Sequence, residues 1–206
     1  MMKKGIDISK WQRKIDFEKV KKNVDFIIIK CGGSDSGFYK DKFFDYNYEM
    51  CKKYKIPTGC YYFVGKNFIS TNDGTREAKR FFELIKDKQF EYPIVLDIET
   101  TSPKNKTGAT NATIAFCKYM ESKGYYISIY ASDIYGFKER LEINRLNEFD
   151  KWVASYSKNP PTYVKEYGMW QYSSKGIING INGNVDLNYS YKNYPSIMKK
   201  NKLNGF

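Results

Sequence analysis

The chain alternates short apolar segments with longer stretches of helical character, and this rhythm constrains its fold more than any other feature. Runs such as Phe26-Ile27-Ile28-Ile29 and Ile94-Val95-Leu96 are typical of strands that are covered on both faces. With 206 residues, the chain has the length of one domain. Eight strands are expected, at residues 5–9, 26–31, 58–64, 93–99, 126–131, 151–155, 168–172 and 185–188.

Helical patterns fill the early gaps between these strands. Helices are expected at 41–54, 71–86 and 111–123, and weaker ones at 134–141 and 143–149. The last two connections, which are rich in Pro and Gly, are expected to be loops. The order predicts an α/β fold, a (β/α)₈-like TIM barrel with shortened crossovers, and an open doubly wound sheet is the alternative. We assign 1–193 to the barrel and expect 194–206 to be a surface tail or the start of a linker.

The chain has no histidine, and this absence excludes many kinds of chemistry. A Ser-His-Asp relay, a histidine general base and a His-ligated zinc site are all ruled out. The remaining candidates for reactive groups are carboxylates, Lys, Tyr and Cys. Four cysteines at irregular spacings are expected to be reduced and buried. No metal or other cofactor is implied, since the acids lack the spacing of a calcium loop.

Four carboxylates lie at the ends of three predicted strands. Asp97 and Glu99 are two residues apart, so in a strand they point to the same face, about 6.6 Å apart along the chain. Asp7 and Asp186 lie on the first and last strands, and all four acids could meet at one mouth of the barrel. The pKa values of neighbouring carboxyl groups move apart, so that one group keeps its proton near neutral pH and can act as a general acid. Such a pair suits glycoside cleavage, with Glu99 as the acid.

Several other side chains are candidates for binding a substrate. Flat aromatic rings suit the apolar faces of sugars, and a lysine that ends an apolar strand needs a carboxylate partner. Trp11 and Phe63 are instead expected in the core, and Gln12 and Gln171 are expected to make structural hydrogen bonds. The substrate-binding candidates are Tyr62, Tyr130, Lys30, Tyr39 and Trp170.

Short motifs along the chain resemble those of the family 25 glycoside hydrolases, the Chalaropsis-type lysozymes. The main ones are DISKWQ from Asp7, PIVLDIE ending at Glu99, WQY at 170–172 and VDLN at 185–188. Between them, IIK ending at Lys30, YKD at 39–41 and GCYYF at 59–63 also resemble family segments. The match runs in the expected order from Gly5 to about Asn188.

The resemblance implies an N-acetylmuramidase that cleaves the β-1,4 bond after N-acetylmuramic acid in bacterial peptidoglycan. It also implies an irregular, flattened barrel of eight strands with fewer than eight helices. Glu99 matches the family's proton donor, and Asp97, Asp7 and Asp186 match the other acids of the site. Asp97 would orient the sugar's N-acetyl group for internal attack.

Three other functions remain open alternatives. A net charge of +12 suits nucleic acid, but the lysines are scattered and no nucleic-acid motif appears. A barrel that binds glycan without cutting it would be expected to lose Glu99, which is present. A phosphate-binding barrel would need the glycine-rich segment 176–183 to hold the phosphate.

The expected partners are peptidoglycan and, through diffuse and salt-sensitive attraction, anionic wall polymers. No specific nucleic acid and no membrane span are expected, and the chain is expected to be monomeric. The N-terminus lacks an apolar signal-peptide core, so we expect synthesis in a host cytoplasm. A bacteriophage endolysin that acts on the wall after release fits this expectation better than a secreted autolysin.

Overall fold

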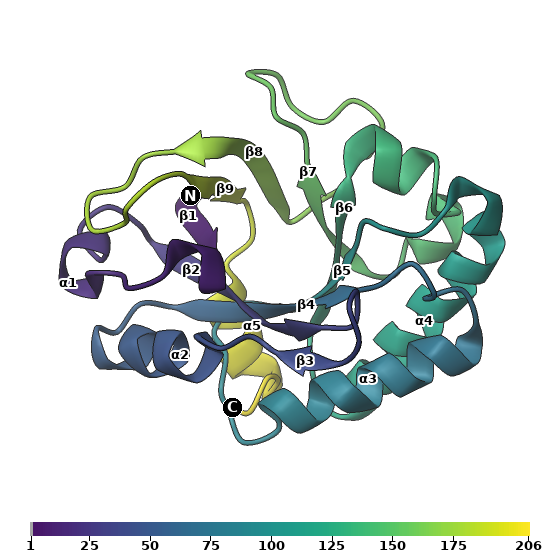
Figure 1. Ribbon diagram of the computed structural model, residues 1–206, viewed down its shortest axis with the longest axis horizontal. Helices are drawn as coiled ribbons and strands as arrows, with labels where there is room; N and C mark the ends of the chain where they lie inside the picture. The colour runs from purple at the N-terminus through teal and green to yellow at the C-terminus, as the bar shows by residue number, and fades with distance from the viewer. Residues whose placement is uncertain (1) are drawn as a thin grey trace.

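The computed structural model describes residues 2–206 and shows a closed barrel of eight strands (Figure 1). Each strand pairs with the next around the ring, and a parallel pairing between the first two closes it. This closure excludes the open doubly wound sheet. The barrel strands are β1 (Lys3–Ile8), β2 (Phe26–Gly33), β4 (Thr58–Val64), β5 (Ile94–Ile98), β6 (Ile127–Ser132), β7 (Asp150–Ala154), β8 (Met169–Gly176) and β9 (Val185–Ser190).

All eight expected strands are present, and two features depart from a regular barrel. A short extra strand, β3 (Tyr39–Lys40), pairs with the end of β2. The last strand, β9, runs antiparallel to both of its neighbours, β1 and β8, whereas the other ring pairings are parallel. The start of β9 therefore lies at the carboxyl end of the other strands.

Helices cover only part of the outside of the barrel, as expected. The longer ones are α2 (Phe44–Lys53), α3 (Thr71–Ile85) and α4 (Lys106–Ser122), and a single turn forms α1 (Phe17–Val20). Helix α4 starts five residues before the expected position, because a 3₁₀ turn at Pro103–Asn105 leads directly into it. The segment after β6 forms a π-helical turn at Asp133–Lys138 and a 3₁₀ turn at Ile143–Leu146. Another 3₁₀ turn, Lys10–Gln12, follows β1.

Side chains along each strand point alternately out of the barrel and into it, and they form two separate apolar cores. Outward-facing side chains pack against α3 and α4, where Tyr62 stacks with Phe81. Gly74 allows these two helices to approach closely, since a Cβ at this position would lie only 2.1 Å from the carbonyl oxygen of Ala112. Inward-facing side chains form a separate cluster inside the barrel that includes Trp152. Side chains on adjacent positions of a strand thus enter different environments.

The C-terminal segment is part of the barrel, and the expectation of a surface tail at 194–206 is wrong. Helix α5 (Tyr194–Asn201) places the fully buried Tyr194 and Met198 in the inner core. Beyond it, the buried Asn204 accepts a hydrogen bond from the Tyr126 amide (2.7 Å) and donates one to the Tyr92 carbonyl (2.9 Å). These contacts fix the segment across the end of the barrel opposite the acids.

Two further expectations concern cysteines and membrane spans. The four cysteines are reduced and buried, as expected. None of the helices within residues 2–206 has the length and apolar character needed to cross a membrane.

Candidate active site

The four acids meet in one small pocket at the carboxyl end of the parallel strands. Asp7, Asp97, Glu99 and Asp186 all line this pocket, which has a volume of about 140 Å³. Asp97 lies on β5, and Glu99 follows its last residue, so both point into the barrel, as the two-residue spacing predicts. The structure therefore brings together carboxylates that are up to 179 residues apart in sequence.

The antiparallel direction of β9 explains how Asp186 reaches the site. Asp186 is the second residue of its strand, and it pairs directly with Asp7, the fifth residue of β1. Had β9 been parallel, its first residues would have lain at the far end of the barrel. We expected an acid at a strand end, and the structure places it at a strand beginning for this reason.

Amide side chains hold Asp7 in place. Its Oδ2 accepts hydrogen bonds from Gln171 Nε2 (2.9 Å) and Asn188 Nδ2 (2.8 Å). Asn188 in turn accepts one from the indole of Trp152 (2.9 Å). Burial, together with repulsion from the neighbouring Asp186, raises the pKa of Asp7 to about 8, although the two amide hydrogen bonds oppose this shift. Asp7 therefore holds a proton at neutral pH.

The Asp97–Glu99 pair combines burial with mutual repulsion. Burial raises the pKa of Asp97 well above its usual range, and repulsion from Glu99 adds to this effect. Glu99 is exposed at the open mouth of the pocket, and partial desolvation by the surrounding protein raises its pKa. The positive charge of Lys30 lowers the pKa of both Asp97 and Glu99, and that of Arg140 lowers the pKa of Glu99. Because two close carboxylates ionise in separate steps, the pair retains one proton into a higher pH range than an isolated carboxyl would.

One oxygen of this pair has no partner. Oδ1 of Asp97 is buried and accepts no hydrogen bond from any residue in the range 2–206. A buried acceptor without a donor is costly to maintain. The atom is therefore available to a donor on a bound molecule.

Two basic side chains lie beside the pair. Lys30 packs over the ring of Phe63, 4.5 Å from its centroid, and its charge lowers the pKa of both Asp97 and Glu99. Its position beside the acids is the one expected from the sequence. Arg140 was not identified from the sequence, and its Nη1 donates to the backbone carbonyl of Glu99 (2.8 Å).

The five substrate-binding candidates occupy different places. Tyr130 lines the pocket, and its hydroxyl donates to Gln171 Oε1 (2.7 Å). Tyr39 does not line the pocket, and the centre of its ring lies 5.7 Å from the Lys30 ammonium. Tyr62 does not face the pocket, because it points outward and donates to Glu77 on α3 (2.8 Å). Trp170 also points outward, paired in register with Val153, into a neighbouring groove.

Three aromatic residues of the pocket escaped the sequence analysis. Tyr61 and Trp152 lie inside the barrel one position away from outward-facing residues, and Tyr156 follows β7. The hydroxyl of Tyr156 donates to Gln171 Oε1 (2.9 Å), so it joins the network that holds Asp7. Val95 is two residues before Asp97 on β5, so it also points into the barrel, and Tyr61 pairs with Val95. Knowledge of this strand pairing would therefore have identified Tyr61 as an inward-facing residue.

Trp11 also differs from expectation. We expected it in the core, but its side chain is 75% exposed on the 3₁₀ turn after β1. Phe63 packs beneath Lys30.

The geometry supplies a carboxyl group with a raised pKa at the mouth of the pocket, a second carboxyl group with a free oxygen, and aromatic walls around a polar pocket. In the described part of the chain, no group of three or more His, Cys, Asp or Glu side chains could hold a metal ion. Paired carboxylates of this kind perform acid catalysis at a glycosidic bond.

Comparison with known proteins agrees with this chemistry. The family model described as glycosyl hydrolases family 25 matches residues 6–181. The autolytic lysozyme of Clostridium acetobutylicum is 28% identical over 185 residues, which cover 89% of this chain and 54% of that protein. The chain thus spans about half the length of this relative.

Solved structures share the fold. The CTP1L endolysin superposes with a TM-score of 0.83 and 26% identity over 96% of this chain and 70% of that one. The autolysin LytC of Streptococcus pneumoniae, in complex with a synthetic peptidoglycan ligand, gives a TM-score of 0.78 and 27% identity over 92% of this chain and 47% of that one. The match of the family model over most of the barrel shows that the chain belongs to the glycosyl hydrolases of family 25.

Proposed function

We propose that this protein is a lysozyme that hydrolyses the β-1,4 bond between N-acetylmuramic acid and N-acetylglucosamine in bacterial peptidoglycan. The observation that carries the proposal is the Asp97–Glu99 pair, in which Asp97 has a buried oxygen without a partner. Similarity to an autolytic lysozyme, and to an autolysin bound to a peptidoglycan ligand, supports the choice of substrate.

In the proposed mechanism, Glu99 donates its proton to the glycosidic oxygen as the bond from that oxygen to C1 breaks. The carbonyl oxygen of the sugar's own acetamido group attacks C1 and forms a cyclic oxazolinium ion. With the one proton of the pair on Glu99, Asp97 is the carboxylate, and its free Oδ1 accepts a hydrogen bond from the acetamido N–H and stabilises the developing positive charge. Water then adds to C1 as the bond between C1 and the acetamido oxygen breaks, and the Glu99 carboxylate takes the proton from that water.

Asp7 and Asp186 support this chemistry from the opposite wall of the pocket. Protonated Asp7, held by Gln171 and Asn188, keeps that wall rigid and adds no second anion beside the acid pair at neutral pH. Tyr130 and Tyr61 supply flat faces for a sugar ring, and Lys30 moderates the repulsion between the acids.

We place the action of the protein at the bacterial cell wall. The net charge of +12 favours attraction to anionic wall polymers, and this attraction weakens as salt increases. Likeness to the CTP1L endolysin supports a bacteriophage endolysin that is released onto the wall from inside the host. We further propose that the barrel acts as a monomer.

The test is lysis of purified peptidoglycan by the wild type and by Glu99→Gln, with Glu139→Gln as the control. Glu139 is exposed and outside the pocket, so its substitution removes the same charge without touching the site. Loss of the general acid is expected to reduce kcat by about 10²–10⁴-fold, whereas the control retains full activity. An unimpaired Glu99→Gln variant would refute the role of Glu99. A covalent sugar adduct trapped on Asp97 or Asp7 would refute attack by the acetamido group.

A further inference from the structure

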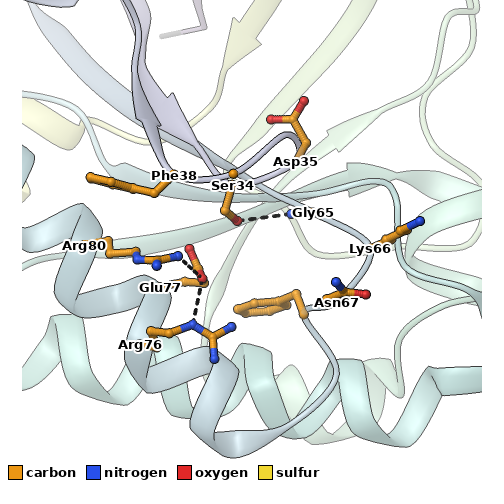
Figure 2. Close-up of a pocket in the computed structure, with 11 residues that line it drawn as sticks. Ser34, Asp35, Phe38, Gly65, Lys66, Asn67, Arg76, Glu77 and Arg80 are labelled. Atoms are coloured by element: carbon orange, nitrogen blue, oxygen red, sulfur yellow. Dashed lines mark hydrogen bonds and ion pairs between the residues drawn. The ribbon is translucent and has the colours of Figure 1, made fainter.

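A second pocket, separate from the acids, lies between two loops and helix α3 (Figure 2). Its volume is about 280 Å³, and none of its lining residues lines the catalytic pocket. One loop, 34–38, follows β2, and the other, 65–68, follows β4. Because both loops follow the carboxyl ends of their strands, this pocket lies toward the same end of the barrel as the acids.

A buried carboxylate fixes two guanidinium groups in this pocket. Oε1 of Glu77 accepts hydrogen bonds from Arg76 Nε (3.2 Å) and Arg80 Nη1 (2.9 Å), and Figure 2 shows the two arginines converging on it. Oε2 of Glu77 accepts from the Tyr62 hydroxyl (2.8 Å), and Asp73 binds the Nη2 of Arg76 (2.8 Å). Glu77 is 3% exposed, so the arginines are oriented by a group that cannot itself move into solvent.

The guanidiniums still have donors to offer. Arg80 uses only Nη1 within residues 2–206, which leaves its Nε and Nη2 without a protein acceptor. A guanidinium edge with two free N–H groups matches the two oxygens of a carboxylate. With Lys66 on the other side, three basic side chains line the pocket against two acidic ones, Asp35 and Glu77.

An aromatic ring forms the remaining wall. Phe38 is 47% exposed, and the Arg80 guanidinium lies 5.2 Å from the centre of its ring. A ring beside a cation suits a ligand that has a small apolar group next to its anionic group. A peptide that carries carboxylates and alanine-sized side chains has this character, whereas a phosphate alone leaves the ring unused.

We propose that this pocket binds a carboxylate of an acidic peptide, the class of peptide that is joined to muramic acid in peptidoglycan. The proposal rests on the proposed function, which brings such peptides to this end of the barrel. An extended peptide spans about 3.3–3.6 Å per residue, so five residues reach about 17 Å from the sugar that carries them. The pocket would select glycan strands that bear peptides.

Direct binding tests the pocket independently of catalysis. The probe is a soluble tetrapeptide, Ala-Glu-Lys-Ala with free carboxylates, titrated by NMR into the wild type, Arg80→Ala and Lys86→Ala. Lys86 follows α3 at its far end and pairs with Glu83, so its loss removes one charge away from the pocket. The wild type and Lys86→Ala are expected to bind alike, and Arg80→Ala about tenfold more weakly.

Two further arms identify the ligand chemistry and guard against misfolding. Phe38→Ala removes an exposed side chain that the fold does not need, and it is expected to weaken peptide binding as well. The same peptide with every carboxylate amidated should lose binding. Equal affinity of all variants, or binding of inorganic phosphate but not of the peptide, would overturn the proposal.

An activity comparison separates this proposal from the proposed function. Arg80→Ala should lose kcat/KM on peptide-bearing walls, mainly through KM, and lose none on glycan strands stripped of peptide by an amidase. An equal loss on both substrates would overturn the peptide role. A wild type that cleaves neither substrate would contradict the proposed function, and the titration would still decide what the pocket binds.

Discussion

The buried carboxyl of Asp7 makes the stability of this protein depend on pH in a way that one substitution can reveal. Burial, with the adjacent Asp186, raises its pKa from 3.8 to about 8. Each pKa unit corresponds to 1.36 kcal/mol, so the folded state loses up to about 6 kcal/mol when Asp7 must ionise. Asparagine has the same shape, and its Oδ1 can accept from Gln171 and Asn188 while its amide faces Asp186.

The sign follows from the direction of the shift. Below pH 3.8, Asp7 is protonated in both states and costs nothing. Between pH 3.8 and about 8, the unfolded chain releases the proton while the folded chain keeps it, so stability falls as pH rises. Asp7→Asn removes this cost, and its advantage over the wild type should grow across that window and then level off.

Urea denaturation of both proteins from pH 4 to pH 9 measures this difference. Asp16→Asn serves as a control of opposite sign, because hydrogen bonds from Lys19 lower the pKa of the exposed Asp16. That variant should lose a little stability at neutral pH and regain parity as pH falls. Wild-type and Asp7→Asn curves that run parallel at every pH would refute the account of the site's electrostatics.

Three other substitutions test separate parts of the structure. Arg140→Gln removes a cation that lowers the pKa of Glu99, so the alkaline limb of the pH–kcat profile should move to higher pH; an unmoved limb would contradict the contact. Tyr62→Phe leaves an oxygen of buried Glu77 without its donor, so the free energy of unfolding measured in urea should fall by about 1–3 kcal/mol while kcat stays unchanged. A loss of kcat with unaltered stability would show instead that Tyr62 acts in the active site. Asn204→Ala removes two buried hydrogen bonds to the backbone and should cost about 2–4 kcal/mol; a neutral result in the same assay would show that the C-terminal segment is not part of the cooperative fold.

The strands and the Asp97–Glu99 pair were predictable because neighbouring residues determine both. A continuous apolar run such as 26–29 can only be a covered strand or a buried helix, and its short length decides for the strand. Asp97 and Glu99 interrupt a similar run at its end, where a barrel opens to solvent. Neither inference needs information from elsewhere in the chain.

The directions of the aromatic residues were not predictable in the same way. In β4, Tyr61 and Tyr62 are adjacent and chemically alike, and both faces of the strand are apolar. Only the pairing of β4 with β5 decides that Tyr61 enters the barrel and Tyr62 meets α3, and a one-residue error exchanges them.

The C-terminal segment was misjudged for a different reason. Residues 194–206 are rich in Lys and Asn, which is typical of an exposed tail. Its anchoring depends on a few buried side chains, Tyr194, Met198 and Asn204, whose partners lie on distant strands. Such long-range hydrogen bonds leave no periodic pattern in the sequence.

The identity of the new chain ends tests the central claim most directly. Peptidoglycan digested by the wild type would be reduced with borohydride, hydrolysed and analysed for the reduced sugars. Muramitol that appears with the wild type and is absent with Glu99→Gln is the predicted result, because cleavage after N-acetylmuramic acid leaves that sugar at the reducing end. Glucosaminitol in its place, or no reduced sugar at all, would contradict the assignment of this protein as a muramidase.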